Sequence, residues 1–293
     1  MNRIMLSVDL EDWFHPNDFN IPKEHYERYE SRILVNTERL LELFERNSVK
    51  ATFFVLGCVC EKEPELIRRI AAQGHEIACH SFYHELLGNT EREILRSEIR
   101  RAKDMIEDTI GLPVKGFRAP SWSIGHGNLW VLELLQELGF QWDSSLQPFR
   151  TPLSGISGIP DVPFRVAVGC GTPGLLELPP TVHRIGGLPI PYAGGLYMRL
   201  MPLRFLMVML EKDLEHHSPM LYCHPWEYDE GMPVLKRGVF TGITHYHKIK
   251  GNQKKLEQVL DSFSFQTIGE AVAQLLTMEE THGKRLETVR FSC

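Results

Sequence analysis

The residues most suggestive of chemistry in this sequence are His80 and His84, in the segment Cys-His-Ser-Phe-Tyr-His-Glu. Side chains at this spacing project from one face of a helical turn, so the two imidazoles would point the same way. Neutral imidazoles in that arrangement are typical ligands of zinc and other divalent metals. Such a pair can arise by chance among 13 histidines, and a catalytic zinc site also needs a third protein ligand and an open position for water. The pair therefore indicates a metal site only if another part of the chain supplies that ligand.

Three carboxylates follow the first apolar run of the chain, at Asp9, Glu11 and Asp12. Carboxylates crowded this closely repel one another unless a cation neutralises them. One of them could complete a site of two histidines and a carboxylate, and another could act as a general base. The alternative is a solvated acidic turn, a common structure that is disfavoured here because an apolar strand leads directly into the acids and then into Trp13-Phe14.

Two further residues carry side chains suited to hydrolysis. Arg118 precedes a turn fixed by proline, in Gly-Phe-Arg-Ala-Pro, where its guanidinium could orient a carboxylate through paired hydrogen bonds. His224 follows an apolar run in Leu-Tyr-Cys-His-Pro-Trp, and a histidine that titrates near neutral pH suits proton donation to a leaving group. Each residue alone is more often structural, so they indicate a site only where the fold brings them together.

The elements that would position these residues alternate between strands and helices, which indicates βα units and an α/β fold. Strands are predicted over residues 3–8, 51–56, 76–79, 115–118 and 219–223, and helices over residues 36–47, 64–74, 90–110, 128–138, 203–215 and from 267 onward. Thr90 with Glu93, and Thr267 with Glu270, have the spacing of a capping box at a helix start.

Residues 148–200 are rich in proline and glycine and interrupt this alternation. They are expected to form an irregular excursion over one face of the fold, not a separate domain. We therefore predict a single domain over residues 1–293.

Polar residues recur where the candidate strands end. In a barrel of parallel strands the active site lies at the carboxyl ends of the strands, so these side chains are expected to converge. They are Asp9, His80, Arg118, Asp143 and His224.

Composition and charge exclude several classes of protein. The chain has 293 residues, 43% hydrophobic and 24% charged, as in a folded globular domain and not a disordered segment. A net charge of −6 gives no basic surface for nucleic acid. The first apolar stretch is too short for a signal peptide, and no run approaches the ~18 apolar residues of a membrane helix, so a cytoplasmic location is expected. The six cysteines include one C-x-C pair without a second pair, and are expected to be reduced structural thiols.

Together these segments resemble the polysaccharide deacetylase family, the carbohydrate esterases with a NodB-homology domain. The family's second motif, His-Ser/Thr-x-x-His, matches His80 to His84 in full, its third, Arg-x-Pro, matches Arg118, and its fifth, Leu-x-x-His, matches His224. The first motif, usually Thr-Phe-Asp-Asp-Gly, is replaced by Ser-Val-Asp-Leu-Glu-Asp, and the fourth is similar to Trp-Asp-Ser-Ser around Asp143.

The order and approximate spacing of the motifs agree over residues 4–275. The Asp-x-Glu-Asp-Trp start, the His-Pro-Trp-Glu segment and His-Tyr-His-Lys at residues 245–248 look like one subgroup, associated with bacterial exopolysaccharide or surface-glycan biosynthesis. The resemblance implies a distorted (β/α) barrel, usually of seven strands.

The resemblance also implies an acid–base set. Asp9 matches the general base that activates a metal-bound water. Arg118 would hold Asp9, and His224 would protonate the departing amine. Asp143 would tune His224.

A metal site is implied in the same way, with His80 and His84 as ligands. The usual third ligand, an Asp adjacent to the base, is replaced by Leu10. Glu11 would share the face of Asp9 in a strand and is the preferred substitute, whereas Asp12 reaches the metal only if the chain turns there. The metal is expected to be a single divalent ion, zinc by preference, with cobalt and nickel as alternatives.

The expected activity is that of a metal-dependent hydrolase which removes N-acetyl or O-acetyl groups from a bacterial carbohydrate or its precursor. Two alternatives remain open: hydrolysis of another amide, such as a cyclic imide or formamide, on the same fold, and a catalytically silent glycan-binding module. Retention of a complete acid–base set disfavours the second. Four aromatic residues could stack on sugar faces, with core packing as the alternative: Trp13, Trp122, Tyr192 and Trp226.

Overall fold

The computed structural model describes residues 2–151, 153–168, 174–235, 238–283 and 285–291. Strands of the main sheet within these residues are β1 (Ile4–Leu10), β2 (Thr52–Val55), β3 (Glu76–Cys79), β4 (Gly116–Phe117), β5 (Trp142–Asp143), β6 (Phe164–Val168), β7 (Leu175–Glu177), β10 (Met220–Cys223), β11 (Phe265–Gln266) and β12 (Thr288–Phe291). Their order is β10-β1-β2-β3-β4-β5-β7-β6-β12, with β11 paired to β1. Every ladder from β10 to β7 is parallel, and β6 is antiparallel to β7.

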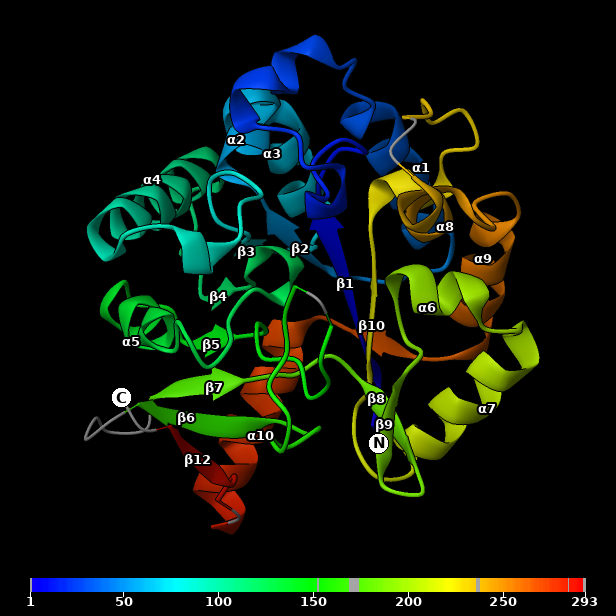
Figure 1. The fold of residues 1–293 in the computed structure, drawn as a ribbon. Helices are drawn as coiled ribbons and strands as arrows, with labels where there is room; N and C mark the ends of the chain where they lie inside the picture. The colour runs from blue at the N-terminus through cyan, green and yellow to red at the C-terminus, as the bar shows by residue number, and fades with distance from the viewer. Residues whose placement is uncertain (1, 152, 169–173, 236–237, 284, 292–293) are drawn as a thin grey trace.

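The helices connect these strands and cover the sheet (Figure 1). They are α1 (Ile33–Arg46), α2 (Gly57–Lys62), α3 (Pro64–Ala72), α4 (Arg92–Ile110), α5 (Trp130–Glu137), α6 (Gly195–Leu200), α7 (Leu203–Leu214), α8 (Val239–Tyr246), α9 (Asn252–Ser262) and α10 (Ile268–His282). Short 3₁₀ turns are η1 (Asn17–Phe19), η2 (Lys23–Arg28), η3 (Leu87–Asn89), η4 (Pro120–Trp122) and η5 (Pro225–Tyr228). No helix in the described part of the chain is long and apolar enough to cross a bilayer.

The burial pattern explains why the sequence adopts this arrangement. Every residue of β1 is buried, as expected for a strand at the centre of a parallel sheet that is covered on both sides. In α4 the buried side chains recur every three or four residues and form one apolar face against the sheet, namely Leu95, Ile99, Ala102 and Ile106. The predicted distorted (β/α) barrel is confirmed.

The barrel is distorted because no ladder among the described residues joins β10 and β7, the two ends of its parallel run. The sheet order begins at β10, and the last strand of the parallel run is β7. Between them, the Met220 amide donates to Thr181 Oγ1 at 2.5 Å, and Gly194 forms an isolated bridge with Tyr222. Single contacts of this kind leave the sheet open on one side.

The segment 148–200 contains more regular structure than its composition indicated. It supplies β6 and β7 to the main sheet, and β8 (Val182–Ile185) pairs with β9 (Leu188–Pro191) in a separate hairpin. These strands are short, and prolines and glycines surround them, so alternation of apolar and polar residues was too brief to predict them. The chain then returns to the sheet through α6.

The two predicted capping boxes have different outcomes. At the start of α10, Thr267 Oγ1 accepts the Glu270 amide at 3.1 Å, and Glu270 Oε2 accepts the Thr267 amide at 3.0 Å. At the start of α4 the N-cap is Glu91, and no side-chain cap forms there, so the box predicted for Thr90 was wrong. The cause is that α4 begins at Arg92, one residue later than a capping box at Thr90 requires.

This difference supplies a matched pair of variants. Thr267→Ala removes a formed cap and is expected to lower the free energy of unfolding by about 1 kcal/mol. Thr90→Ala removes the same hydroxyl where no cap forms and is expected to leave that free energy nearly unchanged. Urea unfolding of both variants measures the difference, and equal losses would contradict the assignment of the two helix starts.

Candidate active site

The carboxyl ends of four strands that lie together in the sheet carry the predicted site residues. These strands are β10, β1, β3 and β4, and in the sheet order β2 lies between β1 and β3. Asp9 is at the end of β1, His80 and Arg118 directly follow β3 and β4, and His224 directly follows β10. The convergence predicted from the strand ends is therefore observed for these four residues.

Glu11, His80 and His84 form a compact group of metal-ligating side chains. One ligand atom from each lies within 4.8 Å of the others, and all three residues are buried. His80 Nδ1 donates to the main-chain oxygen of Arg118 at 2.7 Å, because a carbonyl can only accept. The lone pair is then on His80 Nε2, which is buried and has no hydrogen-bond partner among the described residues. Burial lowers the pKa of His80 to about 4, so the ring is neutral and suited to bind a cation.

The two histidines do not lie on a helical turn, and that expectation was wrong. β3 ends at Cys79, and the chain then passes through bends in which Ser81 has a φ of 68°. The bends nevertheless bring the rings of His80 and His84 to a centroid distance of 5.3 Å. The Asn17 side-chain amide lies 3.1 Å from His84 Nδ1 and fixes the second ring.

Glu11 is the carboxylate that joins the histidines. Its Oε2 lies 2.8 Å from His84 Nε2, and its Oε1 accepts the indole N–H of Trp226 at 3.0 Å. Burial by itself would raise the pKa of Glu11, but the nearby His84 and His224 and these hydrogen bonds lower it well below its usual range. β1 ends at Leu10, so Glu11 lies in a turn and not in strand geometry.

Asp12 occupies a different environment, although the chain does turn there. Both its carboxylate oxygens accept the main-chain N–H of Arg32 at 3.1 Å, and Oδ1 also accepts the amide of Trp13. Burial raises the pKa of Asp12. Its carboxylate therefore ties two loops together and is not part of the group formed by Glu11 and the histidines.

Asp9 and Arg118 form the buried ion pair that the sequence indicated. Arg118 Nη1 lies 2.6 Å from Asp9 Oδ1, and Arg118 is 0% exposed. The guanidinium also donates to Ser7 Oγ and Ser144 Oγ at 3.0 Å, and lies 3.9 Å from the centre of the Phe54 ring. These contacts hold the Asp9 carboxylate in one orientation toward the cavity.

His224 lies opposite Asp9 and Glu11. Its Nε2 is 3.8 Å from Asp9 Oδ2 and 3.7 Å from Glu11 Oε1, and its ring stacks on Trp226 at 5.2 Å. Burial would lower the pKa of His224, but the charges of Glu11, Glu227 and Asp9 raise it to about 9. The ring is therefore protonated at neutral pH and can donate a proton.

The structure does not bring Asp143 to His224. Asp143 Oδ1 accepts the hydroxyl of Ser145 at 2.5 Å, and Asp143 lies opposite Glu177 in the β5–β7 ladder. Burial raises the pKa of Asp143 to about 6, and burial together with the Asp143 charge raises the pKa of Glu177 well above its usual range. Asp143 thus belongs to a buried acid pair, contrary to the expectation that it tunes His224.

Glu227 is the residue that the sequence reasoning missed. Its Oε2 accepts the His224 amide at 3.0 Å and lies 3.1 Å from His224 Nδ1. The signal in the sequence was the spacing of His-Pro-Trp-Glu. A glutamate three residues after the histidine can accept the main-chain N–H of that histidine, as in a capping box.

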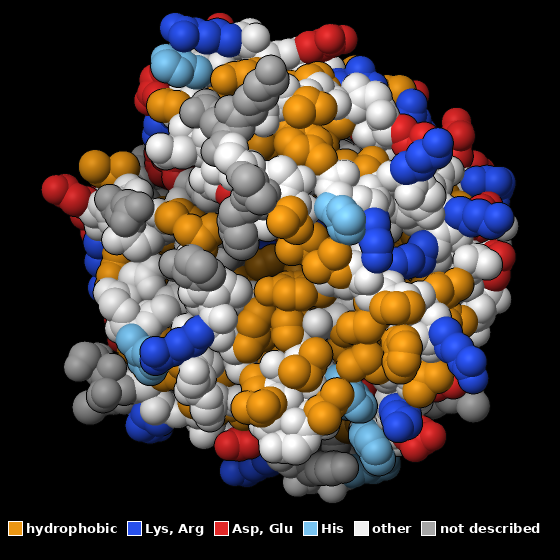
Figure 2. Space-filling view, turned by 45° about the vertical axis from the view of Figure 1, so that its right-hand side comes forward, with side chains coloured by type: hydrophobic (Ala, Val, Ile, Leu, Met, Phe, Trp, Pro, Cys, Tyr) orange, Lys and Arg blue, Asp and Glu red, His pale blue; other side chains and the backbone are white. Residues whose placement is uncertain are grey.

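These side chains face a cavity of about 470 Å³. Asp9, Glu11, His84 and His224 line its floor, and aromatic side chains line its walls, namely Trp122, Tyr197, Tyr222 and Trp226. Figure 2 shows hydrophobic side chains gathered around a hollow on one face of the molecule. Two aromatic residues expected near sugars lie in the core, because Trp13 Nε1 donates to the Glu30 carbonyl and the Tyr192 hydroxyl donates to Asp213.

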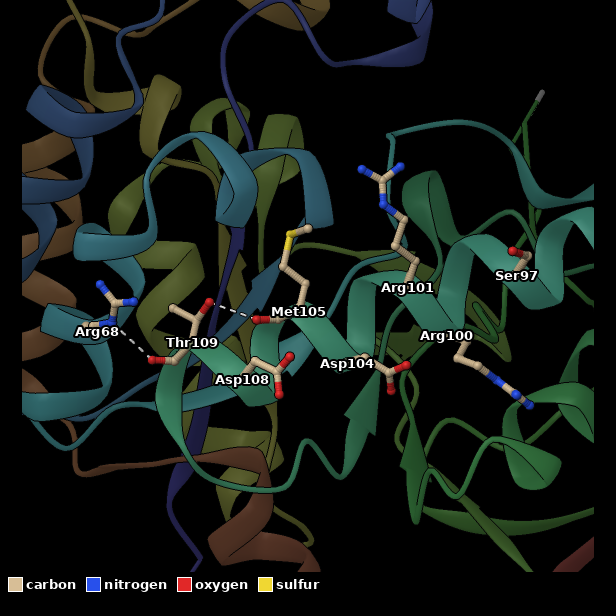
Figure 3. A pocket seen from close by; sticks show the side chains of 8 residues that line it. All are labelled: Arg68, Ser97, Arg100, Arg101, Asp104, Met105, Asp108 and Thr109. Atoms are coloured by element: carbon tan, nitrogen blue, oxygen red, sulfur yellow. Dashed lines mark hydrogen bonds between the residues drawn. The ribbon is translucent and has the colours of Figure 1, made fainter.

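A second hollow lies on the outer surface of α4, and Figure 3 shows its side chains. Arg68 Nε donates there to the Thr109 carbonyl, and along the helix Arg100 and Arg101 are followed by Asp104 and Asp108. Within the described residues, the group of Glu11, His80 and His84 is the only cluster of possible metal ligands, and it lies at the strand ends. The strand-end cavity is therefore the candidate active site.

Comparison with known proteins matches two parts of the chain. Residues 31–142 match the family model described as polysaccharide deacetylase, and residues 144–273 match one described as a domain of unknown function (DUF3473). A Bacillus cereus peptidoglycan-N-acetylglucosamine deacetylase is 33% identical over 98 residues, covering 33% of this chain and 36% of that protein. A Rhizobium leguminosarum bv. trifolii chitooligosaccharide deacetylase is 37% identical over 70 residues, covering 24% of this chain and 33% of that protein. The chain thus spans less than half the length of either relative.

Solved structures share the whole fold. A probable polysaccharide deacetylase from Pseudomonas aeruginosa PAO1 matches with a TM-score of 0.59 at 16% identity, over 96% of this chain and 92% of that one. The Puue allantoinase matches with a TM-score of 0.61 at 14% identity, over 96% and 91%. At these identities the likeness concerns the fold. What these matches show for this chain is a region, residues 31–142, that is similar to polysaccharide deacetylases.

Proposed function

We propose that this protein is a metal-dependent deacetylase that hydrolyses the N-acetyl group of an amino sugar in a bacterial glycan or its precursor. The observation that carries the proposal is the group of Glu11, His80 and His84, of which Glu11 and His84 line the same cavity as Asp9 and His224. Relatives that are peptidoglycan and chitooligosaccharide deacetylases support the substrate class.

The metal would be held by Glu11, His80 and His84. His80 fits this role because its buried Nε2 has no other partner, and Glu11 fits because burial leaves its carboxylate facing two imidazoles. A divalent ion such as zinc, when bound, supplies a Lewis acid that polarises the acetyl carbonyl and lowers the pKa of a water. Two imidazoles and a carboxylate suit zinc, cobalt and nickel alike.

Asp9 and His224, whose Oδ2 and Nε2 atoms lie 3.8 Å apart, would supply proton transfer. Asp9, paired with Arg118, would accept the proton of the attacking water. His224, which is protonated, then delivers a proton to the sugar nitrogen as the carbon–nitrogen bond breaks, giving acetate and the free amine. Trp122, Tyr197 and Tyr222 line the cavity beside this site and provide aromatic surface for a sugar, whereas one face of Trp226 is already covered by His224.

The first prediction concerns metal content. His80→Ala removes the ligand whose Nε2 has no other partner, so we expect loss of stoichiometric metal by elemental analysis. His216→Ala, at an exposed position, is the matched control and should retain the metal. Full metal content in His80→Ala would disprove the proposed ligand set.

A second prediction separates the two candidate carboxylates. Glu11→Gln should weaken metal binding strongly, because it removes a charged ligand. Asp12→Asn should weaken it little, because Asp12 bonds to the Arg32 amide. Titration with zinc against a competing chelator measures both affinities, and a larger loss for Asp12→Asn would reverse the assignment.

The third prediction tests the chemistry. Asp9→Asn and His224→Ala should each lower the rate of acetate release from N-acetylated chito-oligosaccharides by ~10²–10⁴-fold, the usual effect of removing a general base or acid. Both variants should remain folded and retain metal. The activity of the parent should fall as pH rises through the pKa of His224, because the acid loses its proton, and His224→Ala should lack this alkaline limb.

Near-parent turnover by both variants would refute these roles. A cyclic imide and a formamide tested in parallel address the alternative amides. Preferential hydrolysis of either one by the parent would replace the proposed acetylated substrate.

A further inference from the structure

Two oppositely charged side chains are buried directly behind His224. Arg199 Nε donates to Glu227 Oε1 at 2.9 Å, and each residue is 1% exposed. Burying such a pair is costly unless hydrogen bonds satisfy the remaining polar atoms. The other guanidinium nitrogens of Arg199 donate to main-chain oxygens at the end of α8, those of Thr244, His245 and His247. The guanidinium is therefore fixed from several sides.

The Glu227 carboxylate divides its two oxygens between Arg199 and His224. While Oε1 accepts from Arg199, Oε2 accepts the main-chain N–H of His224 and lies 3.1 Å from His224 Nδ1. A carboxylate held at both ends can fix the rotation of the imidazole and keep the Nδ1 proton in place. The other nitrogen, Nε2, then faces the cavity beside Asp9.

We propose that Glu227, anchored by Arg199, is the positioning residue that orients the imidazole of His224 in this protein, in place of Asp143. The inference rests on the proposed function, in which His224 is the acid. Asp143 instead accepts from Ser145 and lies beside Glu177 in the β5–β7 ladder, and His224 is not among its recorded contacts in the described part of the chain. The stack of Trp226 on His224 restrains the ring from a second direction.

The backbone at the end of α8, around residues 245–248, takes part in the same arrangement. Its main-chain oxygens, together with that of Thr244, are the acceptors that hold Arg199. α6 and the end of α8 are thereby joined behind His224. The carbonyl groups at the end of α8 hold Arg199, which holds Glu227, and Glu227 in turn contacts His224.

The test uses Glu227→Gln, which keeps the side-chain volume. An amide presents one oxygen and one NH₂, so it cannot accept from both Arg199 and His224. In the zinc-loaded protein, the His224 Nδ1–H resonance, assigned by its absence in His224→Ala, should be lost or broadened in ¹H–¹⁵N spectra. With acetylated chito-oligosaccharide, kcat should fall by about 10- to 10²-fold, less than removal of the acid itself, while KM stays unchanged because Glu227 is buried.

Two matched variants complete the experiment. Glu279→Gln makes the same substitution in a distant pair, where Glu279 lies 2.5 Å from Arg165, and should leave both the resonance and kcat unchanged. Asp143→Asn should leave the His224 resonance in place. If Glu227→Gln does not fold, Glu227→Asp, which keeps the charge but is too short to reach both partners, is expected to show the same two losses.

The inference is overturned if the resonance and kcat of the Glu227 variant match the parent, or if the resonance is lost in Asp143→Asn instead. Because the resonance does not depend on turnover, it decides the orientation of His224 even if the parent releases no acetate. In that case the proposed function fails separately.

Discussion

The buried guanidinium of Arg118 is the point on which the site depends. A charge with no solvent exposure is tolerated only where counter-charge and hydrogen bonds surround it, and here Asp9, Ser7 and Ser144 provide them. The main-chain oxygen of the same residue accepts from His80 Nδ1, so it also sets which nitrogen of that ligand remains free. One residue at the end of β4 thus fixes the proposed base and one proposed metal ligand, which come from β1 and β3.

A second buried pair, Arg199 with Glu227, lies on the other side of the cavity. The first pair belongs to strands at the centre of the sheet, whereas the second joins α6, η5 and the end of α8. In each pair one carboxylate oxygen contacts the arginine and the other lies near His224. Asp9 Oδ2 is 3.8 Å from His224 Nε2, and Glu227 Oε2 is 3.1 Å from His224 Nδ1. The arrangement leaves His224 Nε2 between Asp9 and Glu11, with a raised pKa that follows from three nearby carboxylates.

The two matched regions of the chain meet in this cavity. Residues 31–142 supply His80, His84 and Arg118, whereas the region 144–273 supplies His224 and Glu227. β1, which precedes both regions, pairs with β2 of the first and β10 of the second. The indole of Trp226 makes a further link by donating to Glu11. The candidate site therefore draws on both regions.

The sequence by itself determined the α/β class, most strand positions and the set of residues at the strand ends. Apolar runs that end in Asp9, His80 and His224 were sufficient because parallel strands place their carboxyl ends at one edge. It could not decide what each side chain faces once the strand has ended. Glu11 and Asp12 are adjacent acids, and only the turn after Leu10 and the distant Arg32 amide separate their roles. Likewise Asp143 and Glu227 are both acids near family positions, and which one reaches His224 depends on contacts with Glu177 and Arg199, far away in the chain. Hydrogen bonds between distant residues are formed only by tertiary packing. For that reason the sequence predicted where the site lies and, through the family resemblance, the pairing of Arg118 with Asp9, but not the partners of Asp12, Asp143 and His224.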